Sequence, residues 1–152
     1  MSLFPILLYA FQATSPAPQI EVVDAHFYAV DARSGELGVS ETNVIPQRPD
    51  TSCFGWTIEI VPGKGEVTLR EELRLPSRAG DWPSSSETNV HPDGAGATTT
   101  LVQNLSDGIL AHEWCLSAGD PAGPHSVRVF HGDRLLREFN FTVVPEPDRS
   151  TI

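Results

Sequence analysis

Residues 53–61 read CFGWTIEIV, and this stretch decides the fold class of the chain. Large apolar side chains occupy every second position, at Phe54, Trp56, Ile58 and Ile60, and smaller or polar residues lie between them. Successive side chains of a β-strand point to opposite faces of its sheet. The alternation therefore predicts a strand with one face buried in a core.

A second strand is expected directly after the first, because residues 62–65 (PGKG) are a strong turn signal. Residues 66–75 return with apolar side chains of one parity, interrupted by Glu71: Val67, Leu69, Leu73 and Leu75. The run VTLREELRL also contains good helix formers, so a helix is the alternative. The flanking turns and the short run favour a strand.

Further short apolar segments follow the same pattern: residues 20–30, 35–45, 98–105, 108–117, 125–131 and 134–144. The second of these is the weakest and precedes a turn-rich stretch over residues 46–50. Thirteen prolines and twelve glycines lie between the apolar runs, as in all-β proteins. Residues 77–97 form a long polar connection, expected to be either functional or mobile.

The end of the chain, residues 123–144, reads GPHSVRVFHGDRLLREFNFTVV. Gly132-Asp133 suits a tight two-residue turn between two strands. In the second of these strands one parity is expected to share a face: Leu135, Phe139, Phe141 and Val143. This hairpin resembles the last hairpin of many bacterial exported immunoglobulin-like domains, which commonly end in a Gly-initiated strand, a Gly-Asp turn and a Phe-x-Phe-x-Val strand.

The resemblance implies an antiparallel immunoglobulin-like β-sandwich, and the spacing of the apolar runs predicts about seven or eight strands. Closure into a β-barrel is the lesser alternative. The resemblance implies no particular function, because such domains serve as adhesin modules, chaperone-like subunits and accessory domains of enzymes.

The first residues predict export. Residues 3–11 are an apolar run of signal-peptide length, too short to span a bilayer, and a small and polar stretch follows at residues 13–17. We therefore predict a signal peptide over residues 1–17, a β-sandwich domain over residues 18–147 and a polar tail over residues 148–152. No Lys or Arg precedes the run, so an amino-terminal strand is the alternative.

The expected location is the bacterial periplasm or the exterior. Lys64 is the only lysine among ten basic residues, the others being arginine, and this usage is typical of a GC-rich bacterial genome. The chain has a formal charge of −10 and lacks the basic surface that a nucleic-acid binder needs. An anionic membrane would repel a chain of this charge. No nucleic-acid partner and no membrane span are expected, and the oligomeric state is left open.

Cys53 and Cys115 are the only cysteines, and in an exported protein two cysteines most often form a disulfide. Two buried free thiols are the alternative. In the alternation along its strand, each cysteine points to the face opposite that of a nearby tryptophan: Cys53 opposite Trp56, and Cys115 opposite Trp114. If these tryptophans face the core, the disulfide lies on an outer face and links neighbouring strands, unlike the disulfide between the sheets of antibody domains.

No set of residues indicates catalysis or a cofactor. The histidines lack metal-binding spacing and are expected at the surface or at strand edges: His26, His91, His112, His125 and His131. Glu71 and Glu72 would point to opposite faces of a strand, so they are not expected to act as a carboxylate pair, and a solvated strand is the simpler interpretation.

Trp82 is the best candidate for contact with a partner. It lies in the sequence GDWP within the polar residues 77–97, where an aromatic ring either folds back onto the domain or meets a ligand. We therefore expect a non-enzymatic binding module for a protein or a glycan. The alternatives are a barrel-like carrier of a small apolar ligand and a metal-dependent enzyme.

Overall fold

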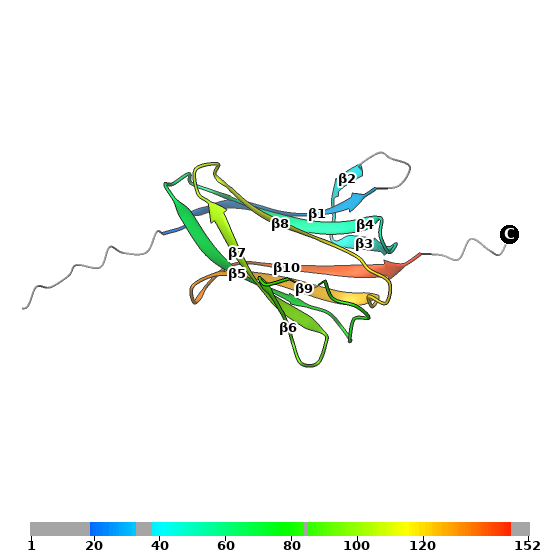
Figure 1. Ribbon diagram of the computed structural model, residues 1–152. Helices are drawn as coiled ribbons and strands as arrows, with labels where there is room; N and C mark the ends of the chain where they lie inside the picture. The colour runs from blue at the N-terminus through cyan, green and yellow to red at the C-terminus, as the bar shows by residue number, and fades with distance from the viewer. Residues whose placement is uncertain (1–18, 33–37, 84, 147–152) are drawn as a thin grey trace, which may run out of the picture.

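The computed structural model describes residues 19–32, 38–83 and 85–146, which form ten strands in two layers (Figure 1). Within these ranges the regular structure is all β, as the alternating pattern predicted, and no helix is long and apolar enough to cross a membrane. The predicted signal peptide and the predicted polar tail lie outside the described residues.

One layer is a four-stranded antiparallel sheet in the order β2-β1-β4-β8. Its strands are β1 (Val22–Asp31), β2 (Gly38–Glu41), β4 (Ser52–Ile60) and β8 (Ile109–Cys115). The decisive stretch of the sequence is thus β4, an inner strand with neighbours on both sides.

The other layer is a six-stranded sheet in the order β3-β10-β9-β5-β7-β6. Its strands are β3 (Val44–Gln47), β5 (Glu66–Arg74), β6 (Thr88–Val90), β7 (Gly96–Asn104), β9 (Gly123–His131) and β10 (Arg134–Pro145). All its pairs are antiparallel except that of β3 with β10. The two separate sheets make a sandwich and not a closed barrel.

The core lies between the sheets and is rich in aromatic rings. The alternating residues of β4 are all buried, as predicted: Phe54, Trp56, Ile58 and Ile60. The ring centroid of Phe141 on β10 lies 4.6 Å from that of Phe54 and 4.6 Å from that of Phe27 on β1. Such aromatic contacts join the two sheets through the interior.

The single strand expected over residues 35–45 is instead two short strands in different sheets. β2 pairs with β1, whereas β3 runs parallel to β10. Pro46, expected in a turn, is part of β3. An edge strand tolerates a proline because one side of its backbone needs no ladder hydrogen bond. A further strand, β6, lies within the polar residues 77–97 and covers the edge of β7.

The last hairpin has the predicted two-residue turn, in which Gly132 has a φ of 56°. The expected side-chain parity is wrong at its start. The register shifts between Leu135 and Arg137, so Leu136 is buried and Leu135 is 43% exposed. A β-bulge adds one residue to a strand and reverses the faces of the side chains beyond it.

Gly55 lies under the ring of its cross-strand partner Tyr28. A Cβ atom at this position would lie 2.6 Å from Cζ of Tyr28 and 2.8 Å from the carbonyl oxygen of His112. The absence of a side chain therefore lets Tyr28 pack against the backbone of β4.

We expect Gly55→Ala to lower the free energy of unfolding by about 2 kcal/mol, because the added methyl group overpacks a rigid backbone contact. Urea unfolding would measure the loss. Gly63→Ala is the control, since its Cβ would meet only ordinary contacts with Leu105 at 3.5 Å. Equal stability of the two variants would contradict this explanation.

Candidate functional site

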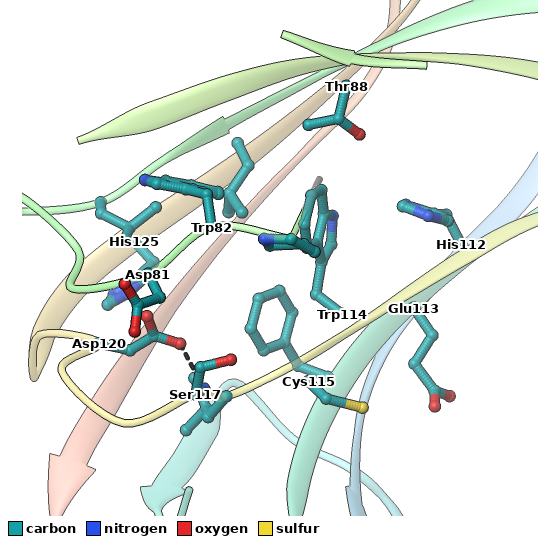
Figure 2. Close-up of a pocket in the computed structure, with 15 residues that line it drawn as sticks. Asp81, Trp82, Thr88, His112, Glu113, Trp114, Cys115, Ser117, Asp120 and His125 are labelled. Carbon is teal, nitrogen blue, oxygen red and sulfur yellow. Dashed lines mark hydrogen bonds between the residues drawn. The ribbon is translucent and has the colours of Figure 1, made fainter. Parts of the chain in front are cut away.

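A cleft of about 410 Å³ opens at the end of the sandwich where β8 ends. We call it the tryptophan cleft, after the two rings in its wall. Figure 2 shows Trp114 near its centre and Trp82 beside it, with Asp81 and Asp120 on one side and His112 on the other. The core residues Phe54, Leu73 and Leu75 contribute apolar surface to its lining.

Trp82 is folded back onto the domain and still lines the cleft. Its Nε1–H donates a hydrogen bond to the carbonyl oxygen of Gly94 at 3.1 Å. Its ring meets that of Trp114 edge to face, with the centroids 6.1 Å apart and the planes at 86°. Of the two expected positions for this ring the structure shows the first, but the ring remains only partly buried.

A buried carboxylate holds Trp114 in place from inside the sandwich. Glu71 on β5 is fully buried, and its Oε1 accepts a hydrogen bond from Trp114 Nε1 at 2.6 Å. Its Oε2 accepts one from Trp56 Nε1, also at 2.6 Å. His112 Nδ1 lies 2.9 Å from the same oxygen. Glu71 thus links the two sheets through three side chains.

The prediction that Glu71 lies on a solvated strand was wrong. Its parity is that of Val67, Leu69 and Leu73, all buried, so β5 directs it into the core, while Glu72 points to the other face and contacts Arg70 and Arg128. A buried carboxylate is costly unless hydrogen bonds compensate for lost water.

The sequence held a signal for this arrangement. Glu71 interrupts an otherwise apolar parity, and two tryptophans expected in the core each bring an N–H group that needs an acceptor. The sequence does not say which strands face each other. His112, expected at the surface, has a side chain only 26% exposed because it packs toward Glu71.

Two further titratable groups lie at the cleft in partly dehydrated positions. Oδ2 of Asp120 accepts a hydrogen bond from the backbone N–H of Ser117 at 2.6 Å, and burial raises the pKa of this carboxyl. His125, expected at the surface, is buried, and its burial lowers the pKa of the imidazole. It has the parity of Val127 and Val129 on β9 and packs on Phe141.

The structure contains the Cys53–Cys115 disulfide. The two cysteines are register partners on β4 and β8, so the bond links neighbouring strands of one sheet, as their phase predicted. Figure 2 shows the sulfur of Cys115 turned away from the rings of Trp82 and Trp114. Both predicted features of this region, the disulfide and Trp82, therefore lie around the end of β8.

The carboxylate of Glu113 lies close to the disulfide. In the part of the chain that the structure describes, Glu113 and the two cysteines are the one group of His, Cys, Asp or Glu residues near enough to share a metal ion. A cysteine binds a metal ion through its thiolate, and here the two sulfurs are bonded to each other. In this state the group lacks the ligands for a metal centre.

Comparison with known proteins supports the architecture. An immunoglobulin-like protein from Pseudomonas aeruginosa is similar in structure, with a TM-score of 0.56 and 22% identity over 84% of this chain and 98% of that one. The soluble domain of PmoD from Methylocystis sp. has a TM-score of 0.46 and 13% identity, over 82% and 97% respectively. No curated protein matches the sequence. Residues 25–144 match the family model described as the PM0630 beta sandwich domain, so the chain belongs to that family.

Proposed function

We propose that the protein is an exported, non-enzymatic binding module that recognises a protein or glycan partner through the tryptophan cleft. The observation that carries this proposal is the edge-to-face pair of Trp82 and Trp114 in the wall of a 410 Å³ cleft. Tryptophan is enriched among the residues that dominate binding energy, because a large rigid ring loses little entropy on contact.

The cleft is organised before a ligand arrives. Glu71 fixes the N–H of Trp114, and Gly94 fixes that of Trp82, so both rings are oriented by hydrogen bonds within the domain. A preorganised site avoids the cost of ordering side chains when the partner binds. The same hydrogen bonds leave the rings, and not their N–H donors, to meet the partner.

Binding fits the polar groups at the cleft better than catalysis does. His112 lines the cleft and its Nδ1 lies 2.9 Å from Glu71 Oε2, but both carboxylate oxygens of Glu71 already accept indole N–H groups inside the core. A general base must reach a substrate proton. The exposure of Glu71 is 0%, which suits a role in holding Trp114.

Export is supported by the disulfide, since disulfides form and persist in oxidising compartments such as the periplasm. The apolar run at residues 3–11 is consistent with the same route. We place the protein in the bacterial periplasm or outside the cell.

We expect Trp82→Ala to weaken capture of the native partner from a cell-envelope extract by roughly tenfold or more, as for a residue central to an interface. Quantitative pull-down with the immobilised domain would measure the loss. Trp82→Phe keeps a ring against Trp114 and should lose less.

The matched control is Leu135→Ala, an exposed apolar residue in the hairpin at the other end of the sandwich. It should capture the partner as the unchanged protein does. A folded Trp82→Ala variant that captures the partner equally well would disprove the proposed role of the cleft.

A further inference from the structure

We infer that the tryptophan cleft receives a cationic side chain, arginine or lysine, from a basic segment of a partner protein. The inference rests on the proposed function and narrows it to one kind of partner. It is carried by three properties of the cleft: the charge of its lining, the carboxylates of Asp81 and Asp120 beside the rings, and the arrangement of the rings themselves.

The lining is acidic and contains no lysine or arginine among the described residues. Asp81, Glu113 and Asp120 line the cleft together with His112 and His125. The whole chain has a formal charge of −10. Complementary charge attracts a basic partner and repels an acidic one, which sets both the association rate and the choice of partner.

Two of these carboxylates are available to a ligand. In the part of the chain that the structure describes, no salt bridge joins Asp81 or Asp120 to another residue; Asp120 accepts a hydrogen bond from the backbone of Ser117 and interacts electrostatically with His125. Figure 2 shows both carboxylates on the same side of Trp114, near Trp82, whereas Glu113 lies on the other side. Carboxylates accept hydrogen bonds, so they match a ligand that donates N–H groups.

The two indole rings form a corner that suits a cation. Their planes are 86° apart and their centroids 6.1 Å apart. The face of a tryptophan ring attracts ammonium and guanidinium groups, more strongly where water is excluded. The apolar surface of Phe54, Leu73 and Leu75 would contact the aliphatic stem of the same side chain.

The cleft suits a side chain that belongs to a polypeptide. It is open to solvent at Asp81, which is exposed, so a side chain can enter while its backbone stays outside. The carboxylates of Asp81 and Asp120 only accept hydrogen bonds, so they match the N–H donors of a cationic side chain.

The test is a calorimetric titration of the whole folded domain with three blocked peptides that differ at one central residue: arginine, lysine or citrulline, which is the neutral counterpart of arginine. We expect the arginine peptide to bind roughly tenfold or more tightly than the citrulline peptide. The double variant Asp81→Asn with Asp120→Asn should bind the arginine peptide at least about tenfold more weakly. Asparagine can still accept the hydrogen bond from Ser117, so this variant should keep its fold, which its melting temperature checks.

The control variant is Asp107→Asn, an exposed residue in the turn between β7 and β8, at the other end of β8. It changes the net charge without touching the cleft and should bind the arginine peptide as the unchanged domain does. Equal binding of the citrulline peptide, equal loss in Asp107→Asn, or no binding of either basic peptide would each overturn the inference. If free argininamide binds as tightly as the arginine peptide, the inference that the cationic side chain belongs to a polypeptide is overturned.

The two proposals fail in different ways. If Trp82→Ala loses the native partner while the double aspartate variant keeps it, the cleft is the binding site and its ligand is not cationic. If Trp82→Ala keeps the native partner, the proposed function itself is wrong.

Discussion

Glu71→Gln is expected to lower the free energy of unfolding by about 3 kcal/mol. Glu71 offers one oxygen to the indole of Trp56 and the other to that of Trp114. Glutamine has one oxygen and one NH₂ group, so one indole N–H must face another donor. Trp56 is 1% exposed, and no solvent reaches it to compensate.

Urea unfolding followed by tryptophan fluorescence would measure this loss. Glu72→Gln is the matched control, because Glu72 is the next residue on the opposite face and its ion pairs with Arg70 and Arg128 are partly solvent-exposed. Surface ion pairs contribute roughly 0–1 kcal/mol, so this variant should remain close to the unchanged domain.

A double-mutant cycle tests the same network more directly. Trp114→Phe removes one indole N–H and should cost less in the Glu71→Gln background than in the unchanged domain, because the unfavourable donor pair is then absent. Strict additivity of the two substitutions, or a stability loss for Glu71→Gln no larger than that for Glu72→Gln, would contradict the proposed role of this carboxylate.

Loss of the Cys53–Cys115 disulfide is expected to lower the free energy of unfolding by about 4 kcal/mol. The bond joins residues that are 62 positions apart, so it removes many conformations from the unfolded chain. Its two cysteines are already register partners on β4 and β8, and the folded strands should stay paired after reduction.

Urea unfolding with and without a reducing agent would give the difference in stability, and intact mass should rise by two hydrogens on reduction. The double variant Cys53→Ser with Cys115→Ser is the control and should match the reduced protein, whether or not reductant is present. Two free thiols in the unfolded, unreduced protein would contradict the bond, and with it the main support for export.

The sequence was most informative where structure is local. Side-chain alternation in residues 53–61 and 66–75 depends only on neighbours in the chain, and both segments are strands whose alternate residues are buried. The turn at Gly132 is local in the same sense. Within each strand, the cysteine and the nearby tryptophan point to opposite faces, which is also a local relation. It predicted correctly that the disulfide links neighbouring strands on the outer face.

The candidate site was less predictable because its parts come from distant segments. Trp82 was recognisable as an aromatic residue in a polar connection, but Trp114 and Asp120 join it only through the packing of β8 and the turn that follows. Glu71 could be seen to interrupt an apolar parity. The carboxylate oxygens of Glu71 accept hydrogen bonds from the indole N–H groups of Trp56 and Trp114, which are 15 and 43 residues away in the sequence. No periodicity within β5 identifies these two donors.

By itself, the sequence determined an all-β fold, the final hairpin and the position of the cysteines relative to the core, because each follows from the period of two along a strand. Only the tertiary structure decided that β2 and β3 enter different sheets, that a bulge turns Leu136 inward, and that Glu71 is buried between Trp56 and Trp114. These features depend on which strands pair and which faces meet, and hydrogen bonds and packing between distant parts of the chain select both.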